Sequence, residues 1–124
     1  MENMLPARDN GPDGAQGLRK QLDEAVVLRA TVEQLRKDLR ADDIGLPAVG
    51  QGAFEELRAQ VAAVVACRER AGAHALGLLV NRVDLTEAQV HQAMAAEGGH
   101  GLAGAMVLRC LQKVLSRLRH AGLA

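Results

Sequence analysis

The fold is decided by the stretch GLRKQLDEAVVLRATVEQLRKDL (residues 17–39), in which apolar residues recur with a helical period. Two interleaved series repeat every seven positions, namely Leu18, Ala25, Val32 and Leu39, and then Leu28 and Leu35. Leu22 and Val26 widen this apolar stripe at one end, and charged residues up to Asp38 fill the positions between. Coiled coils bury such a seam between helices and leave the charged positions in solvent. The stretch therefore predicts a long first helix, over residues 17–41, whose apolar ridge other helices must cover.

A second helix is predicted over residues 53–80, after a loop that the first helix cannot enter. Three glycines and Pro47 in residues 42–52 prevent a helix from continuing. From Phe54 onward, apolar residues again recur at helical spacing. Within residues 72–83 a helix and a short buried strand would show the same apolar pattern, and we favour the helix. Two antiparallel helices joined by this loop would form an αα-hairpin that buries the two stripes against each other.

The C-terminal part of the sequence predicts two more helices, over residues 86–97 and 102–121. Thr86, with Gln89 three positions later, fits a capping box at the start of the first one. Two adjacent glycines follow residue 97 and would end that helix. Cations in the last turn of the second helix suit its C-terminal end, because they complement the helix dipole. Four helices are therefore expected.

Composition supports a helical fold with a core short of bulky side chains. Phe54 is the only aromatic residue, and the 48% of residues that are hydrophobic include many alanines and leucines, which are the strongest helix formers. A buried alanine contributes little at roughly 25 cal/mol per Å² of apolar surface, so we expect a second copy or another protein to complete the core. Residues 1–16 predict a flexible tail, since glycine and proline lie among polar residues there. The expectation is an all-α domain over residues 17–124, either an antiparallel helical hairpin or a small four-helix bundle with a coiled-coil-like first helix.

The leading functional expectation is a non-enzymatic protein-interaction module that acts as an adaptor or regulatory subunit. It would form a homo-oligomer or bind another helical protein through its apolar stripes. The expected interface residues come from the first and last predicted helices: Leu18, Leu28, Val32, Leu35, Leu39, Leu111, Val114 and Leu118.

The distribution of charge leaves a second function open, that of a small DNA-binding transcriptional regulator. The formal net charge is zero, but four cations and no acidic residue follow Gly98, and these are the alternative nucleic-acid contacts: Arg109, Lys113, Arg117 and Arg119. The ending from Val114 to Leu123 resembles the tail of the recognition helix in winged-helix regulators. With the segment from Leu85 to Val90, that resemblance implies a helix-turn-helix-like C-terminal half and an N-terminal dimerisation helix. The sequence departs from the pattern, because the connection holds no additional helix and no wing hairpin follows.

Catalytic, cofactor and metal chemistry find little support in the residues. The segment from Gly99 to Gly104 spells G-x-G-x-x-G, but it follows a predicted helix where a dinucleotide-binding unit has a strand. The four histidines and two cysteines show no CxxC or HxxxH spacing, and Ser116, the only serine, lies in the middle of a predicted helix. We therefore expect no enzyme activity, no cofactor and no metal.

The cellular setting is expected to be the cytoplasm. Cys67 and Cys110 lie far apart among apolar neighbours, which favours two buried, reduced thiols. No segment reaches the ~18 uncharged apolar residues that a membrane span needs, so no membrane partner is expected. Residues 1–16 contain charges and no apolar run, unlike a secretory signal.

Overall fold

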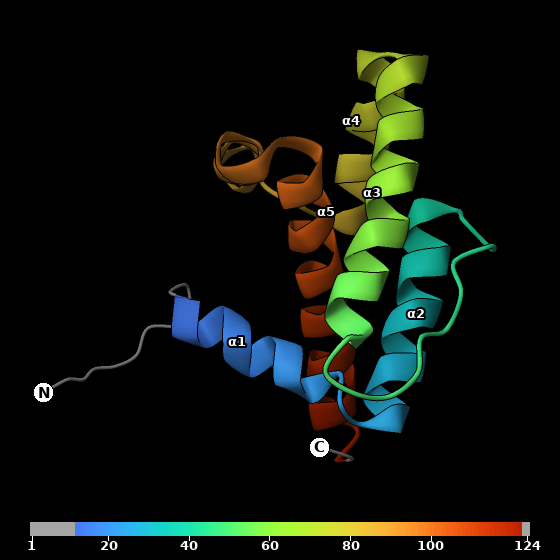
Figure 1. Cartoon of the computed structure of the whole chain (residues 1–124), viewed down its shortest axis with the longest axis vertical. Helices are drawn as coiled ribbons and strands as arrows, with labels where there is room; N and C mark the ends of the chain where they lie inside the picture. The colour runs from blue at the N-terminus through green and yellow to red at the C-terminus, as the bar shows by residue number, and fades with distance from the viewer. Residues whose placement is uncertain (1–11, 123–124) are drawn as a thin grey trace, which may run out of the picture.

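The computed structural model describes the backbone of residues 12–122 and the side chains of residues 17–122. Within that range the chain forms five helices and no strand, which confirms the all-α class: α1 (Pro12–Gln21), α2 (Ala25–Leu39), α3 (Ala53–Ala71), α4 (Ala73–Val83) and α5 (Glu87–His120) (Figure 1). A flexible tail was expected over residues 1–16. Residues 1–11 lie outside the described part of the chain, and residues 12–16 are helical, because α1 begins at Pro12.

The last helix, α5, is the one on which the others pack. Its most extensive contacts are with α3 and α2, and α1 and α4 also lie against it. In Figure 1, α2, α3 and the C-terminal half of α5 run side by side, whereas α1 lies across the lower end of α5. Contact between α2 and α3 is marginal, so the two apolar stripes are buried mainly against α5 and not against each other as expected.

The predicted first helix is interrupted at Leu22–Glu24, between α1 and α2. Tertiary contacts account for the interruption. Leu22 is fully buried, and the guanidinium of Arg19 lies 4.3 Å from the centre of the Phe54 ring. Because α1 lies across α5 with Arg19 on Phe54 of α3, its axis does not continue that of α2 (Figure 1). At its other end α2 stops at Leu39, since Arg40 takes a left-handed conformation with φ of 52°.

The predicted second helix is divided by Gly72 into α3 and α4. Gly72 has a φ of +119°, a conformation that side chains with a Cβ rarely adopt. Residues 73–83 on the far side of this break are helical, so the helix interpretation of the ambiguous segment is confirmed.

The two C-terminal helices of the prediction are joined into α5, with a kink at Glu97–Gly98. The capping box is confirmed, because the Gln89 backbone N–H donates to Thr86 Oγ1 at 3.1 Å and the Thr86 N–H donates to Gln89 Oε1 at 2.9 Å. Past the kink, a Cβ on Gly101 would lie 2.1 Å from the carbonyl oxygen of Ala93, so the two halves of α5 approach within backbone contact there.

Leucine and valine side chains from α2, α3, α4 and α5 form most of the core. None of the helices between residues 12 and 122 combines the length and the hydropathy that crossing a bilayer requires.

Candidate functional site

The residues expected at a partner interface lie mainly inside this chain. Six of the eight are no more than 1% exposed: Leu28, Val32, Leu35, Leu39, Leu111 and Val114. The other two, Leu18 and Leu118, are half-buried and pack against the core. The helices that cover the ridge of α2 belong to the same chain, so one copy closes its own core. The six buried residues are therefore covered by the chain's own helices, whereas Leu18 and Leu118 remain partly accessible to a partner.

The cations proposed for nucleic-acid contact are largely engaged within the chain. Arg109 pairs with Asp84 at 3.0 Å, and Arg117 Nη1 donates to Gln34 Oε1 at 2.6 Å. Lys113 pairs with Asp38 at 2.8 Å, and the side chains of Arg117 and Arg119 are both exposed. A recognition helix must be free on one side to enter the major groove, and the part of α5 after its kink keeps exposed residues at Gln112, Ser116 and Arg119.

Asp38 is the centre of a polar network between α2 and α5. The charge pattern of the sequence placed this residue on the solvated face, but the folded chain leaves it only 8% exposed. Lys113 Nζ donates to Asp38 Oδ2 at 2.8 Å, and Gln34 Nε2 donates to Asp38 Oδ1 at 2.9 Å. The Cys110 thiol is also directed at Oδ2, at 3.5 Å. The carboxylate therefore gathers three donors in a largely dry site.

A signal for this network exists in the sequence. Each helix carries three polar residues at positions i, i+3 and i+7 beside its apolar stripe: Thr31, Gln34 and Asp38 on α2, and Cys110, Lys113 and Arg117 on α5. Gln34 bonds to Arg117 and Asp38 bonds to Lys113, so the two stripes match with the helices antiparallel. The matching polar stripes of α2 and α5, rather than the charges along one helix, indicate the pairing of Asp38 with Lys113.

The pKa of Cys110 indicates that this network has a structural role and that the thiol is not a nucleophile. Burial raises the pKa of the Cys110 thiol to about 12, and the negative charge of Asp38 acts in the same direction. The thiol thus stays protonated at neutral pH and donates a hydrogen bond, whereas a nucleophilic cysteine needs its thiolate. Lys113 Nζ also donates to the carbonyl of Arg82 in α4, at 3.3 Å, while Nη1 of Arg82 is buried with no hydrogen-bond partner. The arrangement ties α2, α4 and α5 together.

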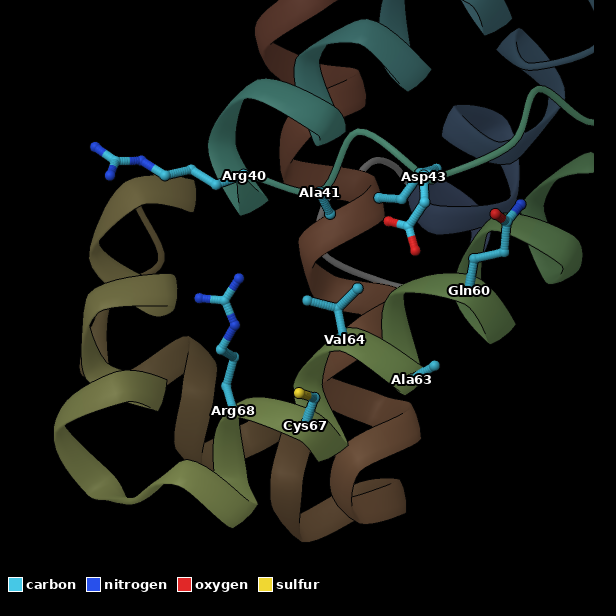
Figure 2. A pocket seen from close by; sticks show the side chains of 9 residues that line it. Arg40, Ala41, Asp43, Gln60, Ala63, Val64, Cys67 and Arg68 are labelled. Atoms are coloured by element: carbon cyan, nitrogen blue, oxygen red, sulfur yellow. The ribbon is translucent and has the colours of Figure 1, made fainter.

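A pocket of about 400 Å³ lies between the end of α2 and α3 (Figure 2). Figure 2 shows Arg68 pointing toward the end of α2, where its Nη2 donates to the carbonyl of Leu39 at 3.2 Å. Gln60 accepts from the N–H of Gly45 at 2.7 Å and donates to its carbonyl at 3.0 Å. These polar groups fasten the loop to α3. Cys67, also on this pocket, is exposed, which corrects the expectation that both thiols are buried.

A larger groove, of about 590 Å³, lies between α1 and the C-terminal half of α5. We call it the α1–α5 groove; its lining residues are Gly17, Leu18, Gln21, Gln112, Leu115, Ser116 and Arg119. Two leucines form its apolar part and the remaining side chains are mainly polar. Two of the residues predicted to act in binding, Leu18 and Arg119, meet here.

The G-x-G-x-x-G segment is explained by helix packing. It lies within α5, past the kink, where a Cβ on Gly104 would come within 3.2 Å of Arg58 Cδ and 3.7 Å of Phe54 Cζ. Gly104 thus lies close to α3, and a Cβ there would need the Arg58 side chain to shift by a few tenths of an ångström. Across the part of the chain with described side chains, no group of three or more His, Cys, Asp or Glu residues gathers as metal ligands would.

Comparison with protein-family models, with curated proteins and with solved structures finds no match to this chain.

Proposed function

We propose that the chain is a non-enzymatic helical module that associates with a second copy of itself and serves as an adaptor or regulatory subunit. The observation that carries this proposal is the position of Val26. It belongs to the apolar stripe of the sequence, yet it is 70% exposed at the start of α2, while Val27 and Leu28 beside it are buried. One copy thus buries only part of the apolar stripe at the α1–α2 junction and leaves Val26 exposed.

A second copy is the partner that the charge of the chain favours. The formal net charge is zero, so two copies do not repel each other through their overall charge. An apolar patch that meets its own equivalent about a two-fold axis is the commonest way in which soluble chains pair.

The interior polar groups support a binding role over catalysis or DNA recognition. The Cys110 thiol and the Lys113 ammonium both donate to the Asp38 carboxylate. Arg109 and Arg117 likewise bond within the chain, which leaves fewer cations for phosphate contacts than the DNA-binding alternative assumes.

Light scattering after size-exclusion chromatography tests the proposal over a series of protein concentrations. The wild-type mass should rise from 13.1 kDa toward twice that value as concentration increases. Val26→Glu should weaken the dimer by roughly tenfold or more, since it places a charge where the dimer would bury the valine side chain. Leu78→Glu is the matched control, because Leu78 is an exposed apolar residue on α4, at 40% exposure. A wild-type mass of 13.1 kDa at every concentration contradicts the proposal.

A further inference from the structure

The bend between α1 and α2 lacks the residues that normally stop a helix. Leu22, Asp23 and Glu24 include neither glycine nor proline. Glu24 occupies the N-cap of α2 without a side-chain cap bond, and the first turn of α2 has no acidic residue. The next two breaks in the chain are encoded locally, by glycines in the loop before α3 and by Gly72 before α4. Local preference at the bend therefore favours a helix.

The backbone at the bend departs from a helix at few residues. The N–H groups of Leu22, Asp23 and Glu24 bond three residues back, at 3.1, 3.0 and 3.2 Å, as in a tight final helical turn. Glu24 is extended, with φ of −95° and ψ of 128°, and the first backbone bond of α2 runs from Leu28 N to Glu24 O at 2.9 Å. A change of conformation at the bend would join α1 and α2 into one helix.

The contacts that hold the bend do not require α1 to belong to the same chain as α3 and α5, on which it lies. They are the burial of Leu22 and the stacking of Arg19 on Phe54. The same contacts form equally well when α1 comes from a second copy. The packing of α1 on α5 is also incomplete, because the α1–α5 groove of about 590 Å³ lies between the two helices.

We infer that two copies associate by exchanging α1, with Leu22–Glu24 becoming helical so that residues 12–39 form one helix. This inference rests on the proposed self-association and specifies how it occurs. In the exchanged dimer, α1 of each copy lies on α5 of the other. Leu18, Leu22 and Val26 are spaced four residues apart, so they share one face of the continuous helix. Straightening therefore brings Val26, which the bent form leaves exposed, into line with Leu18 and Leu22.

Ala25→Pro separates the bent and straight forms. Ala25 is exposed and is the first residue of α2, a position where proline is favoured. The residue before a proline prefers the extended conformation that Glu24 already has. The bent monomer therefore accepts proline, whereas a helix running through residue 25 does not. The dimer dissociation constant should rise by about a hundredfold or more, while the thermal unfolding of the monomer is unchanged.

Asp23→Ala is the variant of opposite sign. Asp23 is exposed in the bent form, and alanine is the better helix former, so the substitution should lower the dimer dissociation constant by roughly twofold. Both variants are compared with wild type by light scattering over the same concentration series, with circular dichroism to show that each is folded.

The outcomes separate this inference from the proposal on which it rests. A dimerising wild type, a folded and monomeric Ala25→Pro, and a tighter Asp23→Ala dimer support both. If Ala25→Pro dimerises like wild type, or if Asp23→Ala dimerises no more tightly, self-association stands and the exchange of α1 is overturned. A wild type that stays monomeric at every concentration overturns both.

Discussion

Removing the carboxylate of Asp38 tests whether the polar network between α2 and α5 stabilises the fold. Asp38→Ala leaves the ammonium of Lys113, the amide of Gln34 and the thiol of Cys110 without their shared acceptor. The Asp38 side chain is 9% exposed and that of Lys113 is 20% exposed. Breaking a buried pair costs about 3–5 kcal/mol, and the partial exposure of Lys113 moves the expected loss to about 2–3 kcal/mol. The carbonyl of Arg82, which also accepts from Lys113, reduces the loss in the same way.

Urea denaturation of a double-mutant cycle measures this loss. Lys113→Met removes the charge that Asp38→Ala strands, so the double variant should be more stable than the sum of the two single effects predicts, by about 1–2 kcal/mol. Asp84→Ala is the control, because it breaks an ion pair with Arg109 whose side chains are 72% and 29% exposed. Such a pair contributes about 0–1 kcal/mol. If Asp38→Ala costs no more than Asp84→Ala, or if the cycle is additive, the network does not stabilise the fold as argued.

Three further predictions concern glycine and cysteine. Gly101→Ala should lower the free energy of unfolding, measured by urea titration, by about 2 kcal/mol or more, because its Cβ would lie 2.1 Å from Ala93 O. Gly99→Ala is the control and should not lower it in this way, because the nearest neighbour of its Cβ is 3.9 Å away. The pKa of Cys110 in the folded chain, about 12, lies above its ordinary value of 9.0, so its stabilising contribution is complete below pH 9 and is lost as pH rises toward 12. Wild type should therefore lose about 1 kcal/mol more stability than Cys110→Ala between pH 8 and pH 10, and an equal loss in both refutes the assignment. A thiol reagent should modify exposed Cys67 rapidly in the native chain and buried Cys110 only on unfolding, as mass spectrometry of the labelled peptides can show.

The helical class could be predicted because local patterns and the fold agree over most of the chain. The capping box at Thr86 satisfies its own backbone groups, so it forms whatever packs nearby. The break at Leu22–Glu24 could not be predicted in the same way, because its residues favour a helix and the bend is favoured by tertiary contacts, namely the burial of Leu22 and the stacking of Arg19 on Phe54. The break inside α5 could also be predicted, because a glycine pair signals a helix end, and Glu97 and Gly98 have non-helical backbone angles there.

Sequence periodicity does not separate burial within one chain from burial between chains, so the expected interface residues stay a prediction. Periodicity identifies Leu28 and Val32 as residues to be covered, but it contains no information on which helix covers them. Charge counting also misplaced Asp38, because a carboxylate is assumed to face water unless a partner from a distant segment, here Lys113, is known.

Hydrogen exchange at the amides of Ala25, Val26 and Val27, measured at low and high protein concentration, tests the proposed association most directly. In the bent chain these amides precede the first backbone bond of α2, which begins at Leu28 N. In a continuous helix they bond to the carbonyls of residues 21–23. The account predicts that their protection rises with concentration while that of the following residues of α2 changes little. Exchange at these three amides that is equally fast at all concentrations would contradict it.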